Sequence, residues 1–251
     1  MTRSSVRLGT RTPVRLGIMA AAMAAMILIG MSPGAHADTQ YWPASSGDWN
    51  GQKVYLSRAC HDEGTGACQE RFGCDGYQEN FWSEWWARYS LRNQNVGGGA
   101  GFLERGYAVR IGDGLVSQNI ASSNAWGSTL HIPLHTNART RNCATNDPSY
   151  GGTWVLYVSS RGQELSQEML NALYIGPGSN DKLVRRTDLG ELNQTNMPAA
   201  YMETEFHTWS HGVTFLTDAK LHSWRLALGV DRCRGYPRAG QGPTRTKYCS
   251  W

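Results

Sequence analysis

Two histidines and two glutamates, spread over the chain, are of the types that metal-assisted hydrolysis uses. His61, Glu79 and His135 offer nitrogen and oxygen ligands, and Glu203 offers a further carboxylate. A hydrolytic zinc site needs three such ligands, one open position for water and a nearby base. Each of these residues alone is more often structural than a ligand, so the interpretation depends on the elements that position them.

Three of the four residues lie at the ends of predicted strands. His61 follows the first of these strands, His135 comes at the end of the second, and Glu203 ends the third. The strands are predicted over residues 53–57, 129–134 and 199–203. In open α/β sheets, sites gather beyond the carboxyl ends of strands, and packing alone does not explain metal-capable residues at three such ends.

Glu79 belongs to a predicted helix over residues 75–92, which Asp75 can cap with Gln78 completing a capping box. Aromatic residues at helical spacing predict a buried stripe on this helix. They are Phe81, Trp82, Trp85, Trp86 and Tyr89. Glu79 lies in line with that stripe, where a charge is costly unless a cation meets it. The alternative is an acid that the helix dipole favours near an N-terminus.

The other predicted elements complete an α/β pattern. Further strands are predicted at 107–111 and 153–158, and further helices at 113–124, 163–174 and 217–229. Strands separated by helices predict a single three-layer α/β/α domain with a mostly parallel central sheet.

The first 37 residues have the features of a secretory signal peptide. Four arginines and no acidic residue precede an apolar run, which ends before Ala35, His36 and Ala37, a small-x-small cleavage pattern. We therefore expect a signal peptide at 1–37, a catalytic domain at 38–232, and a secreted or cell-wall-associated protein without stable membrane insertion. The alternative, a retained membrane anchor, requires a longer apolar run.

The charge balance gives no indication of a nucleic-acid partner. The net charge of +4 comes from the four leader arginines, so residues 38–251 carry equal numbers of basic and acidic side chains. A basic tail is predicted at 233–251. Its cations are Arg234, Arg238, Arg245 and Lys247. This tail would contact anionic wall polymers or simply be a solvated end.

Six cysteines in an exported chain predict disulfide bonds. The pairing is open from sequence alone. Local spacing favours Cys233 with Cys249 and Cys68 with Cys74, which leaves Cys60 for Cys143. A cysteine zinc site is the alternative, but paired C-x-x-C spacing is missing.

Four segments together resemble the zinc-dependent N-acetylmuramoyl-L-alanine amidases of the amidase-3 family. That family shows a strand ending in His, a Glu at the start of the next helix, an S-I-H-x-N-A segment and a P-A-x-L-x-E-x-G-F segment. The corresponding stretches are V-Y-L-S-R-A-C-H at 54–61, G-Y-Q-E at 76–79, I-P-L-H-T-N-A at 132–138 and P-A-A-Y-M-E-T-E-F at 198–206. The resemblance covers about residues 52–230.

The chain also departs from the family's pattern. The family's D-P-G-H-G-G becomes S-R-A-C-H-D at 57–62, Pro133 replaces a strand residue, and Glu205 stands where the family has Gly. The loop around the first ligand must therefore be built differently, and Glu205 is a second candidate for the base.

The resemblance implies specific roles. His61, Glu79 and His135 would hold Zn²⁺, and Glu203 would act as the catalytic acid and base. The substrate would be peptidoglycan, cut between N-acetylmuramic acid and L-alanine, and the enzyme would be a monomer. Asn137, Trp126 and Trp209 would contact the substrate, with a core or rim position as the alternative for the two tryptophans.

Two other functions remain open. A zinc peptidase would use Glu63 close to His61, but the H-x-x-E and H-E-x-x-H patterns are absent. A non-catalytic wall-binding protein would keep the fold and use its ten tryptophans for recognition. Loss of a ligand or of Glu203 would favour that reading, and all four residues are present.

Overall fold

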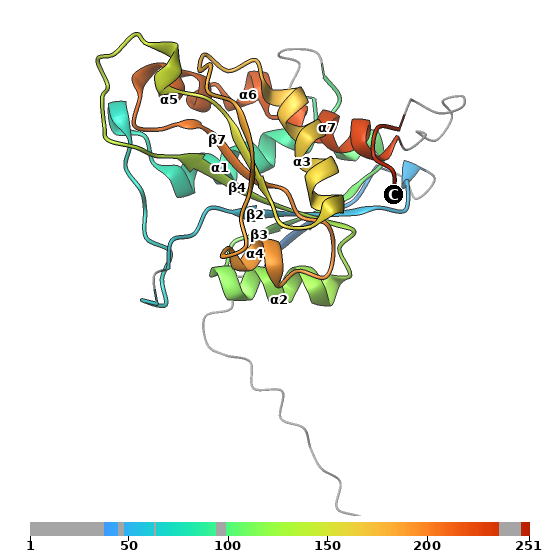
Figure 1. Cartoon of the computed structure of the whole chain (residues 1–251). Helices are drawn as coiled ribbons and strands as arrows, with labels where there is room; N and C mark the ends of the chain where they lie inside the picture. The colour runs from blue at the N-terminus through green and yellow to red at the C-terminus, as the bar shows by residue number, and fades with distance from the viewer. Residues whose placement is uncertain (1–37, 45–47, 63, 94–98, 236–246) are drawn as a thin grey trace, which may run out of the picture. The chain divides into compact units, whose positions relative to one another are not determined.

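A mixed β-sheet forms the centre of the protein (Figure 1). The computed structural model describes residues 38–251 apart from 45–47, 63, 94–98 and 236–246, so the predicted signal peptide and part of the basic tail lie outside the described residues. Within the described part the strands are β1 (Thr39–Tyr41), β2 (Lys53–Arg58), β3 (Ala108–Gly112), β4 (Leu130–Asn137), β5 (Trp154–Tyr157), β6 (Lys182–Arg185) and β7 (Tyr201–Phe206). Their order in the sheet is β1-β3-β2-β4-β7-β5-β6.

The four central strands run parallel to one another, which confirms the mostly parallel sheet. β3, β2, β4 and β7 form this block. At one edge β1 pairs antiparallel with β3, and at the other β5 pairs antiparallel with β7 and parallel with β6. The carboxyl ends of the parallel strands therefore meet at one edge of the sheet.

Helices cover both faces of the sheet, as the three-layer prediction requires. The helices are α1 (Glu79–Ser90), α2 (Val116–Trp126), α3 (Ser160–Leu173), α4 (Gly190–Asn193), α5 (Ser210–Thr217), α6 (Ala219–His222) and α7 (Trp224–Arg234). Figure 1 shows α2 and α4 on one face and the others on the opposite face. Within the described ranges, every helix is too short or too polar to cross a lipid bilayer.

Alternation along β4 assigns its side chains to the two faces. Leu130, Ile132 and Leu134 belong to the main hydrophobic cluster, which also includes residues of α1, α3 and α7. His131 points to the opposite face, where it contacts Ser123 of α2 and Glu191 of α4. Because side chains two residues apart share a face, His135 lies on this second face.

The start of the first long helix differs from the prediction. Asp75 lies in a 3-10 turn, Cys74–Gly76, with φ of 52°, and α1 begins only at Glu79. The helix buries Trp86, but Phe81 is 47% exposed, and Trp82, Trp85 and Tyr89 are half-buried. The aromatic stripe is thus only partly buried, since Trp82 and Tyr89 pack against the main hydrophobic cluster while Phe81 is exposed.

Other element boundaries differ in ways that local patterns do not reveal. The helix predicted at 217–229 is two helices, α6 and α7, broken near Ser223, and α5, which ends at Thr217, was not predicted. The strands β1 and β6 and the short helix α4 were not predicted. The last two are polar and lie at the periphery, so their sequence pattern is weak.

All six cysteines are paired, but two of the three predicted pairs are wrong. Cys233–Cys249 is confirmed. The other bonds are Cys60–Cys68 and Cys74–Cys143, in place of Cys68–Cys74 and Cys60–Cys143. The chain turns back after β2, with His61 bridged to Gln69, and this brings Cys68 beside Cys60.

Candidate active site

His61, Glu79 and His135 come together although they are far apart in the sequence. One ligand atom from each lies within 4.8 Å of the others. Nε2 of His61 is 2.8 Å from Oε2 of Glu79, and Nδ1 of His135 is 3.3 Å from Oε1 of the same carboxylate. The two imidazole rings are nearly perpendicular, with centroids 5.0 Å apart. Three side chains with the donor types of a metal site thus converge on one point.

Glu79 is fixed in this cluster by both its helix and the sheet. It is the first residue of α1 and is 1% exposed. The backbone N–H of Thr136, in β4, donates to its Oε1 at 2.7 Å. Burial alone would raise the pKa of Glu79, but the contacts with His135 and His61 outweigh it and hold that pKa well below its usual range. The carboxylate is therefore charged and correctly placed to bind a cation.

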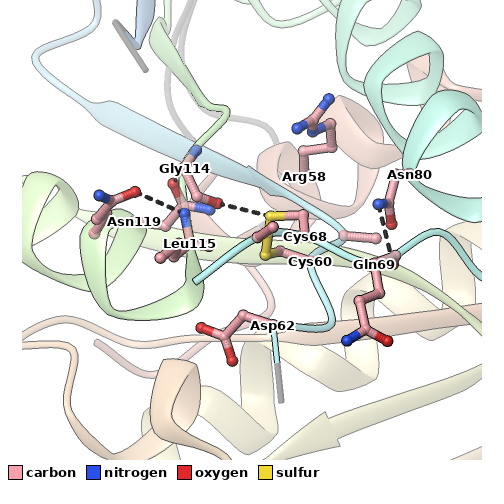
Figure 2. The surroundings of a disulfide bond; sticks show 12 residues. Arg58, Cys60, Asp62, Cys68, Gln69, Asn80, Gly114, Leu115 and Asn119 are labelled. Carbon is pink, nitrogen blue, oxygen red and sulfur yellow. Dashed lines mark hydrogen bonds between the residues drawn. A yellow bond between two sulfur atoms is a disulfide. The ribbon is translucent and has the colours of Figure 1, made fainter. Parts of the chain in front are cut away.

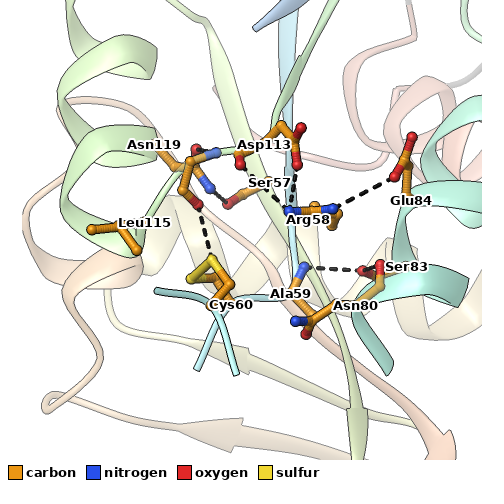
Figure 3. Close-up of polar contacts among 12 residues, drawn as sticks. Ser57, Arg58, Ala59, Cys60, Asn80, Ser83, Glu84, Asp113, Leu115 and Asn119 are labelled. Carbon is orange, nitrogen blue, oxygen red and sulfur yellow. Dashed lines mark hydrogen bonds and ion pairs between the residues drawn. A yellow bond between two sulfur atoms is a disulfide. The ribbon is translucent and has the colours of Figure 1, made fainter. Parts of the chain in front are cut away.

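His61 is held by a loop that a disulfide closes (Figure 2). The loop leaves β2 at Arg58, and the Cys60–Cys68 bond ties the residue before His61 back to the returning strand. Next to it, the backbone N–H of Ala59 donates to Oγ of Ser83 in α1 at 3.1 Å (Figure 3). These contacts replace the Gly-rich loop of the family pattern, as the different sequence there predicted.

The base of the same loop is tied to its neighbours on both sides. Arg58 forms ion pairs with Asp113, which follows β3, and with Glu84 in α1 (Figure 3). Asn119 in α2 accepts from the N–H of Gly114 at 3.0 Å. The disulfide and these polar contacts together position the least buried ligand, His61.

His135 lies in β4 and is almost completely buried. Its ring stacks on Tyr201 of β7, with centroids 4.6 Å apart. Neither ring nitrogen makes a hydrogen bond to any described residue. Burial opposes a charged ring, but the contact with Glu79 outweighs it and raises the pKa of His135. Nδ1 has a charged neighbour in Glu79, but the buried Nε2 has none among the described residues, which is costly unless another partner meets it.

Glu203 lies beside His135 because the two occupy paired positions of adjacent strands. It is half-buried and belongs to the middle of β7, whereas the prediction ended the strand there. Loss of hydration raises the pKa of Glu203 to about 7, helped by the carboxylate of Glu79 and opposed by His135 and Arg186. A carboxyl group with such a pKa can both accept and return a proton near neutrality.

The side chain of Glu205 is buried and bound by backbone N–H groups, as expected of a residue with a structural role. Its side chain accepts from the N–H of Gly152 at 2.8 Å and from that of Gly178 at 3.0 Å, and it is fully buried. Burial raises the pKa of Glu205, and the two backbone donors oppose this. Its φ of 53° is in the left-handed region, a conformation that favours Gly, the residue of the family pattern at this position.

Asn137 lies at the end of β4, two residues after His135. Its Oδ1 accepts from the N–H of Ala138 at 2.9 Å, and its buried Nδ2 makes no hydrogen bond to the described residues. An unsatisfied amide donor next to the ligands is consistent with the predicted contact to a substrate.

The two tryptophans that were predicted to contact the substrate lie in different places. Trp209 is buried, donates from Nε1 to the carbonyl of Thr145 at 2.8 Å, and supports the loop around Gly151. Trp126 ends α2 and lies under Lys53, at the start of β2. The ligands follow the other end of β2, roughly 16 Å away at the usual rise per residue. The structure does not bring Trp126 to the site, and Trp209 has the core position given as the alternative.

His207 is a residue near the site that sequence reasoning missed. Its Nδ1 lies 2.8 Å from Oγ1 of Thr136, whose N–H holds Glu79, and its ring stacks on Tyr77 with centroids 5.8 Å apart. Burial lowers the pKa of His207. Its position four residues after Glu203, on the same segment, was the available signal.

The comparisons with known proteins identify the fold. No protein-family model matches the chain, and no curated protein matches it. Among solved structures, the N-acetylmuramoyl-L-alanine amidase AmiC2 of Nostoc punctiforme is similar with a TM-score of 0.56 at 15% identity, over 71% of this chain and 94% of that one.

Two further solved structures have the same fold. The catalytic domain of the CD27L endolysin targeting Clostridia difficile has a TM-score of 0.57 at 20% identity, over 71% of this chain and 96% of that one. The N-acetylmuramyl-L-alanine amidase Ami1 of Mycobacterium smegmatis has a TM-score of 0.55 at 15% identity, over 72% and 95%. The fold that the motif resemblance predicted is therefore confirmed.

Proposed function

We propose that this protein is a zinc-dependent hydrolase that cuts the amide bond between N-acetylmuramic acid and L-alanine in peptidoglycan. The observation that carries the proposal is the convergence of His61, Glu79 and His135 within 4.8 Å, with Glu203 paired beside His135. Structures of the same fold include N-acetylmuramoyl-L-alanine amidases from Nostoc punctiforme and Mycobacterium smegmatis, which supports the choice of substrate.

The residues fit a zinc ion. Two imidazoles and one carboxylate are a donor set that catalytic zinc sites use. Glu79 is buried and ionised, and both ring nitrogens of His135 are buried without hydrogen bonds among the described residues. An ion held by these three residues would give the Glu79 carboxylate a cation and one ring nitrogen of His135 a partner. When bound, zinc lowers the pKa of water and polarises the carbonyl of a substrate.

The chain's own residues have separable tasks in this proposal. Glu203 accepts the proton of the attacking water and returns it to the leaving nitrogen of L-alanine, so that water is added across the amide bond. Asn137 donates from its unsatisfied Nδ2 to a substrate carbonyl. Tyr201 holds the ring of His135 by stacking and separates it from the short helix α4.

We further propose that the protein works outside the cytoplasm. The arginine-rich leader with Ala35, His36 and Ala37 supports removal of a signal peptide. Three disulfide bonds support an oxidising compartment. Peptidoglycan is found there, so the location agrees with the substrate.

A digest of purified peptidoglycan tests the activity. We expect the release of stem peptides with a new N-terminal alanine and without new reducing sugar ends. A chelator should abolish this release and added zinc should restore it. If the protein binds the wall and releases no peptide under any metal condition, the amidase proposal fails and a wall-binding protein replaces it.

A further inference from the structure

The sheet register places four side chains in one row on the face that carries the candidate site. His135 of β4 pairs with Glu203 of β7, Glu203 pairs with Trp154 of β5, and Trp154 pairs with Lys182 of β6. Residues at paired positions of neighbouring strands point to the same face. We call these four residues the site row. The row extends from the candidate site over two further strands, β5 and β6.

Trp154 and Lys182 form a fixed aromatic surface with a cation over it. Nζ of Lys182 lies 4.7 Å from the ring centroid of Trp154. Nε1 of Trp154 donates to the carbonyl of Asn180 at 2.8 Å, which fixes the plane of the indole. Trp154 is half-buried and Lys182 is exposed. A ring held in this way offers its face to a ligand without further ordering.

A second cation lies on the same aromatic group. Phe206 packs edge-on against Trp154, with centroids 5.6 Å apart, and the guanidinium of Arg139 lies 4.3 Å from the centroid of Phe206. Among the described residues, neither Lys182 nor Arg139 has a carboxylate partner within ion-pair distance. Among the described residues, these two cations are therefore available to an anionic ligand.

The chemistry of a muramoyl peptide decides which part of it this charge can attract. The lactyl carboxyl group of the sugar is consumed in the amide bond that is cut, and the glycan strand offers no other carboxylate. The peptide, by contrast, has a free carboxylate on the glutamate that follows L-alanine. A cation two strands from Glu203 thus favours the peptide over the glycan on the β5 and β6 side.

The distance between Lys182 and Glu203 indicates that Lys182 pairs with the second residue of the stem peptide. Adjacent strands lie about 5 Å apart, so Lys182 is anchored about 10 Å from Glu203, and its Nζ reaches back over Trp154. One extended residue spans roughly 3.5 Å, which puts the carboxylate of the second residue about 7 Å from the scissile nitrogen. Later residues of the stem peptide would extend beyond Lys182.

We propose that Trp154 and Lys182 form a specificity subsite, in which Lys182 pairs with the free α-carboxylate of the second stem-peptide residue and Trp154 supports the peptide. The inference rests on the proposed function, because it takes the amide bond to lie between His135 and Glu203. It orients the substrate with the peptide over β5 and β6 and the glycan on the other side of His135.

Calorimetry with two soluble ligands tests this subsite. The ligands are N-acetylmuramoyl-L-alanyl-D-glutamate, which has the α-carboxylate, and the corresponding D-isoglutamine compound, in which it is an amide; in both, the γ-carboxyl is blocked as a methylamide, so that only the α-carboxylate differs. Glu203→Gln serves as the background so that neither ligand is cut. We expect the acid to bind roughly fivefold more tightly, as for one partly exposed ion pair. Lys182→Ala should remove this preference by weakening only the acid, and Lys182→Arg should keep it.

Lys220 supplies a matched control. Its Nζ lies 5.4 Å from the ring of Tyr89, so it has the same kind of aromatic contact on another part of the surface. Lys220→Ala should leave the preference for the acid unchanged. Equal binding of both ligands to the Glu203→Gln background, or a preference that survives Lys182→Ala, would overturn the subsite.

The two proposals fail in different ways. If the unmodified protein releases stem peptides from peptidoglycan but binding shows no preference for the acid, the subsite is wrong and the amidase proposal stands. If it releases nothing but the Glu203→Gln background binds the acid through Lys182, the subsite stands and the catalytic proposal fails.

Discussion

His135 and Glu203 occupy paired positions of two adjacent parallel strands, and their side chains share one face of the sheet. The backbone hydrogen bonds between β4 and β7 therefore set the spacing between the proposed metal ligand and the proposed acid and base. A pair built on strands in this way is held more rigidly than one built on loops. The predictions below separate what each member of the site does.

Replacing His135 should remove the metal. We expect the purified protein to hold close to one zinc per chain and His135→Ala to lose it, because His61 and Glu79 alone leave the donor set incomplete. Elemental analysis after dialysis measures the content. His211→Ala is the control, since His211 is exposed and contacts Asn146 instead. Full zinc content in His135→Ala would show that the ligand set is wrong.

Replacing Glu203 should stop catalysis and leave the protein intact. Glu203→Gln keeps the shape of the side chain but cannot accept a proton, so the rate of stem-peptide release should fall by at least about a hundredfold. Zinc content and Tm should stay close to those of the parent, because Glu203 is not among the converging ligands. An unchanged rate would remove Glu203 from the mechanism.

Replacing Glu205 should have the opposite effect. In Glu205→Gln one side-chain oxygen remains to accept from one of the two backbone N–H donors, Gly152 or Gly178. The amide N–H₂ then faces the second of these donors. We expect a loss of about 1–3 kcal/mol in the free energy of unfolding, measured by urea denaturation, with most activity kept in the folded fraction. A stable but inactive Glu205→Gln would move the catalytic role to Glu205.

His207 should make stability depend on pH. Burial lowers its pKa, so the folded state binds fewer protons than the unfolded state, and stability is lost as pH falls below the ordinary histidine pKa of about 6.5. His207→Phe keeps the ring against Tyr77 but does not titrate. The free energy of unfolding should therefore fall less steeply between pH 7 and pH 5 in this variant. Identical slopes in both proteins would contradict the assignment.

The Cys60–Cys68 bond should matter for metal binding more than the other disulfides. Removing it in Cys60→Ala/Cys68→Ala frees the loop that carries His61, and zinc affinity should fall roughly tenfold or more, as for loss of an outer support of a ligand. Cys233→Ala/Cys249→Ala is the matched control and should keep zinc affinity. Equal losses in both variants would indicate general destabilisation. In the parent, thiol labelling under denaturing, non-reducing conditions should find no free cysteine.

The parts of the site that a sequence pattern could predict are those set by strand ends. His61 and His135 come together because a parallel sheet brings the carboxyl ends of its strands to one edge, and Glu79 joins them from the start of α1. The predicted start of α1 was wrong because Asp75 adopts φ of 52°, a conformation that its residue type did not reveal. The left-handed turn moves the helix start to Glu79 itself.

Contacts between segments that are distant in the sequence also could not be predicted from it. The cysteine pairs depend on how the chain turns back after β2, so local spacing chose the wrong partner for Cys68. Trp126 is close to the motifs in sequence but lies at the other end of the sheet. Trp154 and Lys182 enter the site row only through the pairing of β5 with β6 and β7, which no local pattern specifies.

Because of the site row, activity depends strongly on the correct register of the strands. Each of its four residues comes from a different strand, and a shift of one strand by a single residue would turn that strand's side chain to the opposite face. Such a shifted molecule would keep its helices, its sheet and much of its compactness while losing the base or the ligand. Misfolded chains of this protein should therefore be inactive before they are visibly unfolded, and peptide release would count native molecules better than circular dichroism does.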